Sequence, residues 1–319
     1  MNRRTRALMA LMARLPRPDP PTPAYLVRIR RELPKPLAHL VLGRGAPGVT
    51  LEDRRLPTGE HEIPVRIYRP AAAAAGPLPL VVNLHGGGFV FGNLTGADWL
   101  CGHVAVQAEV VVVSVDYRLA PEHPAPVPFD DALTATDWLL GHADEIGADA
   151  ARASVLGESA GGNLAALVTL ALRDRRRREP AAPGLVGQML LYPATDLTLS
   201  SPSVTELPEA PMLRRSSMEW YGKQYVPQGL ETSIPLDDPR ISPLHAPDHT
   251  DLPPALVVAA GLDPLRDDAV RYAEVLRAAG VRVREVLYPD ALHGFASIPR
   301  FEPAAQQVLA EIVAHLGSL

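Results

Sequence analysis

Cysteine is almost absent from this chain: Cys101 is the only one among 319 residues. No intrachain disulfide can therefore form, and nothing in the composition calls for an oxidising compartment. Basic residues are not in excess either, because 31 Lys and Arg stand against 36 Asp and Glu, for a net charge of −5. That balance lacks the positive surface that binds nucleic acids or anionic membranes. We therefore expect no nucleic-acid partner.

Long apolar runs are missing as well. No stretch approaches the ~20 apolar residues that a transmembrane helix needs. Near the start, the apolar run of residues 7–13 is short, is broken by Arg14, and is followed by no small-residue cleavage site. This pattern favours an amphipathic helix over a signal peptide. We therefore expect a cytoplasmic protein without a stable membrane anchor.

The motifs that hold metals and nucleotides are also missing. The sequence contains no H-E-x-x-H, no cluster of cysteines and histidines, no P-loop and no G-x-G-x-x-G turn. Each of these motifs places ligand atoms or backbone N–H groups around a metal or a phosphate. Their absence predicts a protein that uses neither a metal nor another cofactor.

The chain does contain an alternation of apolar runs and helical segments. With 47% hydrophobic and 21% charged residues, it can form one large α/β domain with insertions, or two small domains. The first two strands should pair antiparallel through a turn at residues 57–59, and the later apolar strands alternate with helices. That alternation predicts a mostly parallel sheet with helices on both faces. We predict strands over residues 49–56, 61–68, 78–84, 110–115, 153–156, 186–192, 255–260 and 281–288, and helices over 95–108, 129–142, 160–177, 266–279 and 303–316.

The alternation is interrupted at two places. Residues 1–45 have helical spacing, with helices predicted over 4–15 and 25–42, and an insertion after the strand at 186–192 holds an aromatic-rich segment at 216–225. Amphipathic segments outside the sheet must bury their apolar faces, which makes both regions candidates for a cap. We therefore divide the chain into an N-terminal helical cap segment (1–45), a first part of the core (46–196), a cap insertion (197–250) and a second part of the core (251–319).

Residues 152–167 hold the motif on which the functional hypothesis depends. A short apolar run leads into Gly157-Glu158-Ser159-Ala160-Gly161 and leaves as a helix, which is G-x-S-x-G between a strand and a helix. So tight a turn needs small residues on either side of the serine, because the incoming strand and the outgoing helix nearly touch. The turn would expose the Ser159 hydroxyl near a helix N-terminus, where a nucleophile and an oxyanion can both be served. Taken alone, the motif also fits a serine that caps a helix.

A serine nucleophile needs a base, and the base needs a carboxylate to orient it. Among the ten histidines, His293 follows the last predicted strand and precedes the last helix. Loops at the carboxyl ends of parallel strands open on one side of the sheet, which is also the side where Ser159 emerges. By the same reasoning Asp263, just past the strand at 255–260, is the leading carboxylate. Asp290 and Asp196 are weaker alternatives, and Asp267 and Asp268 are expected to complement a helix dipole.

The third requirement is a set of N–H donors for an oxyanion. Residues 85–88 read His-Gly-Gly-Gly directly after a buried strand, so the backbone there can approach a ligand closely. Ala160, immediately after the serine, supplies a further N–H. We expect His85 to brace this loop rather than to take part in chemistry.

At these residues the chain resembles the hormone-sensitive-lipase-like bacterial esterases of the α/β-hydrolase superfamily. The matching blocks are H-G-G-G-F at 85–89, D-Y-R-L-A-P-E-H-P at 116–124, G-E-S-A-G-G-N at 157–163, D-P-L-R-D at 263–267 and H-G-F at 293–295. The resemblance implies an eight-stranded, mostly parallel sheet with a helical cap, and carboxylic-ester hydrolysis without a cofactor. Carried over by position, it implies a triad of Ser159, Asp263 and His293, with oxyanion donors at Gly87, Gly88 and Ala160.

Two positions depart from the pattern that the resemblance implies. Glu158 stands where related sequences have Asp or Thr, and a longer carboxylate on so tight a turn must find a partner. Leu262 stands at a position that is usually more polar. In the 116–124 block, we expect Asp116, Arg118 and Glu122 to pair among themselves and brace a loop beside the site.

The resulting hypothesis is a serine carboxylesterase that acts on a small-molecule ester. We expect short to medium acyl chains, because aromatic residues make up only 5% of the chain and a capped pocket leaves little room. The predicted pocket residues are Phe89, Phe91, Met212, Leu213, Trp220 and Tyr221.

Three further readings stay open at this point. An amidase, or a deacetylase acting on acetylated sugars or drugs, would use the same triad. A non-catalytic receptor on the same fold is disfavoured, because related plant hormone receptors lack the catalytic histidine whereas His293 is present. An exposed strand at 281–288 could pair two subunits into a homodimer.

Overall fold

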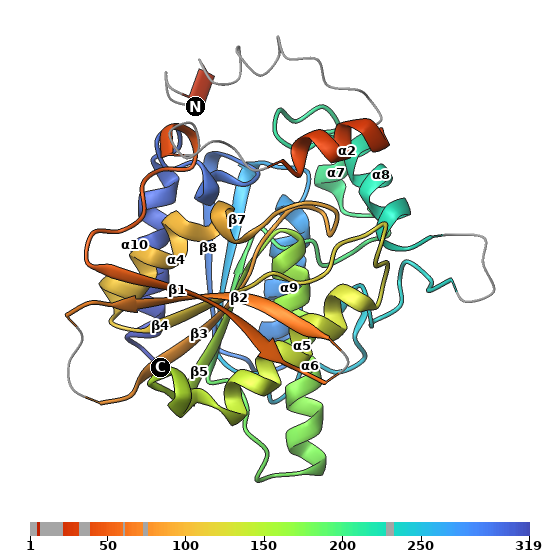
Figure 1. Ribbon diagram of the computed structural model, residues 1–319. Helices are drawn as coiled ribbons and strands as arrows, with labels where there is room; N and C mark the ends of the chain where they lie inside the picture. Colours follow the sequence, from red (N-terminus) through yellow and green to blue (C-terminus); the bar gives the residue numbers. More distant parts are fainter. Residues whose placement is uncertain (1–4, 7–21, 32–38, 60, 73–75, 228–232) are drawn as a thin grey trace.

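The protein is built around one eight-stranded sheet (Figure 1). The computed structural model describes residues 5–6, 22–31, 39–59, 61–72, 76–227 and 233–319. In space the strands follow the order β1-β2-β4-β3-β5-β6-β7-β8. β2 is antiparallel to β1 and to β4, and every other neighbouring pair is parallel, which confirms the predicted mostly parallel sheet. The strands are β1 (Val49–Pro57), β2 (Glu62–Pro70), β3 (Leu78–Leu84), β4 (Val111–Val115), β5 (Ala148–Glu158), β6 (Gly187–Leu191), β7 (Ala255–Leu262) and β8 (Val283–Leu292).

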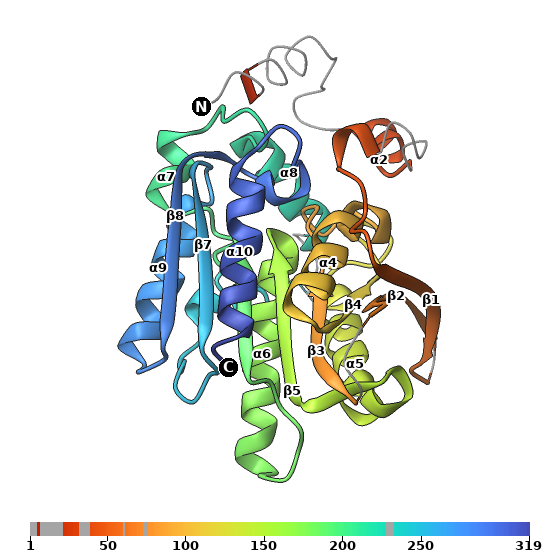
Figure 2. The same ribbon diagram turned by 90° about the vertical axis from the view of Figure 1, so that its left-hand side faces the viewer.

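Helices cover both faces of this sheet (Figure 2). On one face, α4 (Leu94–Ala108) and α10 (Ala304–Leu316) share a buried apolar cluster with alternate residues of the central strands. On the other face, α5 (Val127–Gly141), α6 (Ala160–Arg178) and α9 (Arg266–Ala278) pack into the larger cluster. The central strands are buried on both sides, which is why they are continuously apolar in sequence.

Two strands are longer than their apolar runs. β5 begins at Ala148, because residues 148 and 149 pair with Leu78 and Pro79 ahead of a register shift. β8 continues to Leu292, because a register shift opposite Gly261 lets the strand pass Pro289 and Asp290. The extension of β8 brings the strand directly up to His293. Neither extension could be predicted from an apolar pattern, because the added residues include polar side chains and, in β8, a proline.

Outside the alternating core, the described helical segments gather at the carboxyl ends of the strands. α2 (Pro23–Ile29) from the N-terminal region lies there together with α7 (Pro202–Glu206) and α8 (Arg215–Tyr225) of the insertion (Figure 1). The helix expected over 25–42 is not continuous: α2 ends at Ile29, residues 39–41 are helical again, and residues 32–38 lie outside the described part of the chain. Almost all of the helix expected over 4–15 lies outside the described residues too. The four-part division of the chain remains our prediction.

Arg30, at the end of α2, fastens this segment to the core. Its Nε donates to Val90 O at 2.6 Å, and its Nη1 pairs with Glu122 at 2.8 Å. Glu122 was expected to pair within its own block, but its carboxylate pairs with Arg30 of the N-terminal segment. Arg118 forms a bidentate pair with Asp131 of α5, which ties the 116–124 block to that helix. No helix in the described part of the chain is long and apolar enough to cross a membrane.

Candidate active site

The nucleophile turn joins β5 directly to α6. Ser159 sits between them with φ 55° and ψ −119°, a left-handed φ that side chains rarely adopt. A Cβ at Gly157 would lie 2.1 Å from Gly161 O, and one at Gly161 would lie 2.0 Å from Leu84 O. Both glycines are therefore required by the close approach of strand and helix. The Ser159 N–H donates to Leu191 O at 2.9 Å, which ties the turn to β6.

The three residues predicted as a triad lie in one hydrogen-bonded row. His293 Nε2 is 2.9 Å from Ser159 Oγ, and His293 Nδ1 is 2.7 Å from Asp263 Oδ2. With the proton on Nδ1, the imidazole donates to the carboxylate and Nε2 accepts from the serine hydroxyl. Asp263 is completely buried, and its other oxygen accepts the Leu265 N–H at 2.9 Å. This row has the donor–acceptor geometry of a general base that is oriented by a carboxylate.

Neighbouring strands bring Asp263 and His293 together. β7 ends at Leu262 and its parallel neighbour β8 ends at Leu292, so each side chain is the first one past its strand. The strands approach so closely that a Cβ at Gly261 would lie 2.2 Å from Pro289 O. The structure thus chooses Asp263 over the alternatives Asp290 and Asp196 as the partner of His293.

The glycine loop after β3 folds back beside Ser159. Gly87 and Gly88 have φ of 126° and 58°, and even Phe89 has φ 64°. The Val90 and Phe91 N–H groups donate to Gly87 O at 3.1 and 3.0 Å, which closes the turn. Within the part of the chain that the structure describes, no acceptor is recorded for the Gly87 or Gly88 N–H. Ala160 is the first residue of α6, where N–H groups precede the intrahelical hydrogen bonds.

Aromatic side chains hold this loop from two sides. A Cβ at Gly88 would lie 2.7 Å from the Tyr221 ring, and the Phe89 ring stacks on Tyr225 at 3.8 Å between centroids. Both tyrosines belong to α8. On the core side, the His85 ring stacks on Tyr117 at 4.3 Å. Burial lowers the pKa of His85 to about 4, so this imidazole is neutral and fits the bracing role expected for it.

A cavity of about 380 Å³ opens onto Ser159, and its lining is mostly apolar. Five of the six predicted pocket residues line it. Trp220 does not, and its ring instead packs edge-to-face on Tyr221. Successive residues of a helix point about 100° apart, so only one of the two neighbours can face the cavity. The predicted residues that line it are Phe89, Phe91, Met212, Leu213 and Tyr221, and the apolar residues that the sequence analysis missed include Ile29, Leu42, Leu197, Leu199, Met218, Leu265 and Ile298.

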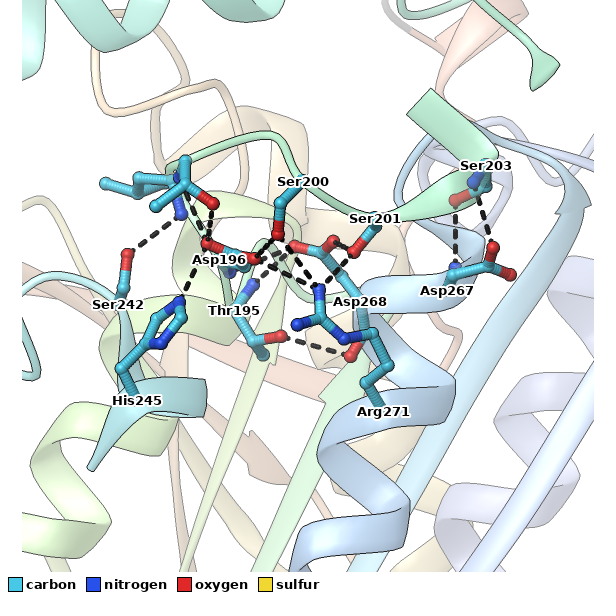
Figure 3. Close-up of polar contacts among 12 residues, drawn as sticks. Thr195, Asp196, Ser200, Ser201, Ser203, Ser242, His245, Asp267, Asp268 and Arg271 are labelled. Carbon is cyan, nitrogen blue, oxygen red and sulfur yellow. Dashed lines mark hydrogen bonds and ion pairs between the residues drawn. The ribbon is translucent and has the colours of Figure 1, made fainter. Parts of the chain in front are cut away.

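Behind the site, the first turn of α9 is bonded to the insertion (Figure 3). Ser203 of α7 donates its N–H to Asp267 at 2.9 Å, and its hydroxyl donates to Pro264 O at 2.6 Å. Asp268 accepts from the backbone N–H groups of Thr195 and Asp196 at 3.0 Å. These acids therefore do more than complement the dipole of α9: they fasten the turn that carries Asp263.

A second carboxylate lies next to Asp268. Asp196 accepts from His245 Nε2 at 3.0 Å and from Arg271 Nη1 at 3.0 Å (Figure 3). Burial raises the pKa of Asp268 to about 7. Burial acts on Asp196 in the same direction, but hydrogen bonds from Ser200, Thr198 and His245 outweigh it and lower the Asp196 pKa below its usual value.

Among the described residues, no group of three or more His, Cys, Asp or Glu side chains is placed to hold a metal ion. Ser159 is instead bonded to a histidine, which is bonded in turn to a buried aspartate. This set supports acyl transfer through a covalent serine intermediate.

Comparison with known proteins agrees with this chemistry. Residues 81–297 match a family model described as an α/β-hydrolase fold. The chain is 41% identical over 274 residues to the carboxylesterase NlhH of Mycobacterium tuberculosis, covering 85% of this chain and 83% of that protein. It is 38% identical over 280 residues to an ethyl acetate hydrolase of Pseudomonas putida, covering 86% of this chain and 84% of that protein.

Solved structures show the same likeness in three dimensions. A hyperthermophilic esterase from the archaeon Pyrobaculum calidifontis superposes with a TM-score of 0.89 at 33% identity. The alignment covers 100% of this chain and 98% of that one.

Proposed function

The chain belongs to the hormone-sensitive-lipase-like esterases of the α/β-hydrolase fold, and from this premise we propose that Ser159, His293 and Asp263 hydrolyse short- to medium-chain carboxylic esters. The similarity to carboxylesterases shows that the chain is a carboxylic-ester hydrolase. Our proposal concerns which residues catalyse the reaction and which lengths of acyl chain the enzyme accepts. The observation that carries it is the row from Ser159 Oγ through His293 to buried Asp263, with distances of 2.9 and 2.7 Å.

The geometry supports a two-step reaction. His293 Nε2 takes the proton of Ser159, whose Oγ attacks the ester carbonyl, and the N–H groups of Gly87, Gly88 and Ala160 receive the oxyanion. Collapse of this intermediate breaks the bond to the alcohol, which leaves with the proton from His293. A water that gives a proton to His293 then attacks the acyl-enzyme, and His293 returns this proton to Ser159 Oγ as the bond to the acyl group breaks and the carboxylic acid leaves. Asp263 holds the imidazole and stabilises its charge throughout.

The cavity supports a limit on the acyl chain. Its volume of about 380 Å³ and its Leu, Met and Phe lining suit a small apolar acyl group. The relative named ethyl acetate hydrolase acts, by its name, on an ester of that size. We therefore expect kcat/KM to peak among p-nitrophenyl acetate, butyrate and hexanoate, and to fall steeply for the decanoate and palmitate. A maximum at palmitate would contradict the proposed range.

Ser159→Ala tests the proposed nucleophile. Hydrolysis of p-nitrophenyl butyrate by the purified variant should fall by about 10⁴-fold or more, because such triads lose nearly all catalysis without the serine. Ser318→Ala is the matched control, since it removes a serine hydroxyl near the end of the chain that bonds to His315 O. Wild-type turnover by Ser159→Ala would refute the assignment. Matched ester and amide substrates decide between an esterase and an amidase.

We further infer a cytoplasmic homodimer. β8 lies at one end of the strand order, so one of its edges has no neighbour within the described sheet, and Leu287 on it is 48% exposed. An unpaired edge strand offers N–H and C=O groups to a second copy. The single, buried cysteine accords with a reducing compartment. A monomer by size-exclusion chromatography with light scattering would refute the dimer.

A further inference from the structure

Glu158 is the residue of the nucleophile turn that neither the triad nor the oxyanion loop uses. It ends β5, next to Ser159, and its half-buried side chain lines the cavity. Its carboxylate accepts the Tyr192 hydroxyl at 2.7 Å and the Ser297 hydroxyl at 3.0 and 2.9 Å. The partner that a longer carboxylate needs at this position is therefore a pair of hydroxyl donors.

Both donors lead to the segment that follows His293. Ser297 is the last residue of the short η3 helix (Phe295–Ser297). The Tyr192 hydroxyl, in addition to donating to Glu158, accepts the Ala296 N–H at 3.3 Å. The Tyr192 ring also lies edge-on to the His293 ring, with centroids 5.1 Å apart. Glu158 thus holds η3 twice, directly through Ser297 and indirectly through Tyr192.

The protonation of Tyr192 fixes the direction of these bonds. Tyr192 is fully buried, and burial together with the Glu158 carboxylate raises the pKa of its hydroxyl well above the usual value. The hydroxyl therefore stays protonated and needs an acceptor. Glu158 is that acceptor, since the Ala296 N–H uses the hydroxyl oxygen as an acceptor itself.

We propose that Glu158 is a positioning residue for the general base: it clamps η3 against the nucleophile turn and so holds His293 at hydrogen-bonding distance from Ser159. The proposal rests on the esterase function proposed above. Besides Glu158, His293 is held by its bond to Asp263 and by the burial of Phe295. Catalysis by a triad needs the base within a few tenths of an ångström of its place, and a 1 Å displacement costs about 10²-fold in rate.

The length of the Glu158 side chain determines which hydroxyl groups its carboxylate can reach. Its stem passes over Gly86, where an added Cβ would lie 3.2 Å from Glu158 Cγ. Aspartate at this position would retract the carboxylate by about 1.5 Å, the length of one carbon–carbon bond. It could then not reach both hydroxyls in their present places. Glu158→Asp therefore shortens the side chain while keeping its charge. Glu158→Gln removes the charge while keeping the length of the side chain.

The test compares kcat and KM for p-nitrophenyl butyrate among Glu158→Ala, Glu158→Asp, Glu158→Gln and the wild type. A displaced base stabilises the transition state less well but does not change how the substrate binds in the ground state. We therefore expect the kcat of Glu158→Ala to fall about 10- to 100-fold, while its KM stays within about twofold of the wild-type value. Glu158→Gln keeps one acceptor oxygen, so its kcat should lie between those of Glu158→Ala and the wild type. Glu311→Gln is the matched control, because it removes a carboxylate paired with Arg284 far from Ser159.

A second set of variants decides the matter even where Glu158→Ala folds poorly. Ser297→Ala should lower kcat a few-fold, and Glu158→Gln combined with Ser297→Ala should lose less than the product of the single effects, since both variants break one clamp. Wild-type kcat in Glu158→Gln and Ser297→Ala, or strictly multiplicative effects, would overturn the proposal.

The two proposals can fail separately. An inactive wild type that also resists a fluorophosphonate would remove the esterase function itself. An active, labelled wild type whose Glu158 variants lose melting temperature but keep kcat would remove the role of Glu158 alone.

Discussion

Two carboxylate clusters flank the triad, and they differ in the burial of their carboxylates and in the groups that these carboxylates bond. The Glu158 cluster (Glu158, Tyr192, Ser297) contains one carboxylate, borders the cavity, and bonds to the segment after His293. The Asp268 cluster (Thr195, Asp196, Ser201, Asp268, Arg271) contains two buried carboxylates, reaches the same cavity through Asp196, and joins the segment after β6 to α9. The Glu158 cluster therefore holds the segment after His293, and the Asp268 cluster holds the segment that carries Asp263.

This difference separates two kinds of consequence. A half-buried carboxylate that bonds to hydroxyls near His293 affects the distance between reacting atoms, so its loss should appear in kcat. Buried carboxylates that collect backbone N–H groups stabilise the fold, so their loss should appear in the free energy of unfolding. Variants in and around the two clusters can test that separation.

Asp263→Asn should have the largest effect, because Asp263 touches the base itself and belongs to neither cluster. An asparagine favours the wrong imidazole tautomer, and kcat should fall by about 10⁴-fold with little change in melting temperature. Steady-state kinetics with p-nitrophenyl butyrate and thermal denaturation measure the two quantities. A loss below about tenfold would mean that another carboxylate serves His293.

Asp268→Ala should mainly affect stability. It leaves the N–H groups of Thr195 and Asp196 and the Ser201 hydroxyl without their acceptor, at a cost of about 3 kcal/mol in the free energy of unfolding. The kcat of the folded fraction should stay within about threefold of the wild type, since Asp268 contacts neither Ser159 nor His293.

Asp130→Ala is the matched control for this stability prediction. Asp130 also lies in the first turn of a helix, α5, but it is exposed. Its loss should therefore cost only the dipole interaction, about 0.5 kcal/mol. Equal urea midpoints for the two variants would show that Asp268 likewise acts only on the dipole of its helix.

An effect smaller than that of Asp268→Ala concerns pH. The pKa of Asp268 rises from about 3.8 to about 7 on folding, so the folded protein binds a proton that the unfolded chain has released. Between these values the contribution of Asp268 to stability decreases as the pH rises, by at most about 1.4 kcal/mol per pH unit. Asp268→Asn removes this dependence, and its stability relative to the wild type should improve from about pH 5 to about pH 7.

Urea unfolding at both pH values measures that difference. Asp196 has a lowered pKa, so its contribution has the opposite sign and is lost only as the pH falls below its usual range. A wild type that gains stability relative to Asp268→Asn as the pH rises would show that Asp268 is ionised in the fold.

The sequence predicts the triad because each member follows a strand at the same edge of a parallel sheet. Ser159 and His293 follow from that rule alone, whereas the hydrogen bond to His293 was needed to decide for Asp263 over Asp196 and Asp290. The partners of Glu158 could not be predicted, since Tyr192 and Ser297 lie 34 and 139 residues away in the chain. The sequence alone shows that a carboxylate lies next to the nucleophile at Glu158, but it does not show which donors bond to that carboxylate.

Helix phase and loop packing account for the remaining differences. Trp220 was assigned to the pocket by its aromatic character, but α8 turns Tyr221 toward the cavity instead. Glu122 was assigned a partner within its own block, yet Arg30 reaches it across 92 residues. In both cases residue type indicated an interaction, and the choice of partner depended on how separate helical segments pack.

Fluorophosphonate labelling of the intact protein, followed by mass spectrometry of the whole chain and of its peptides, tests the proposed nucleophile most directly. We expect one adduct per chain, on the peptide that carries Ser159. The adduct should be absent in Ser159→Ala and should form much more slowly in His293→Ala. A folded wild type without an adduct, or with the adduct on another residue, would contradict the account.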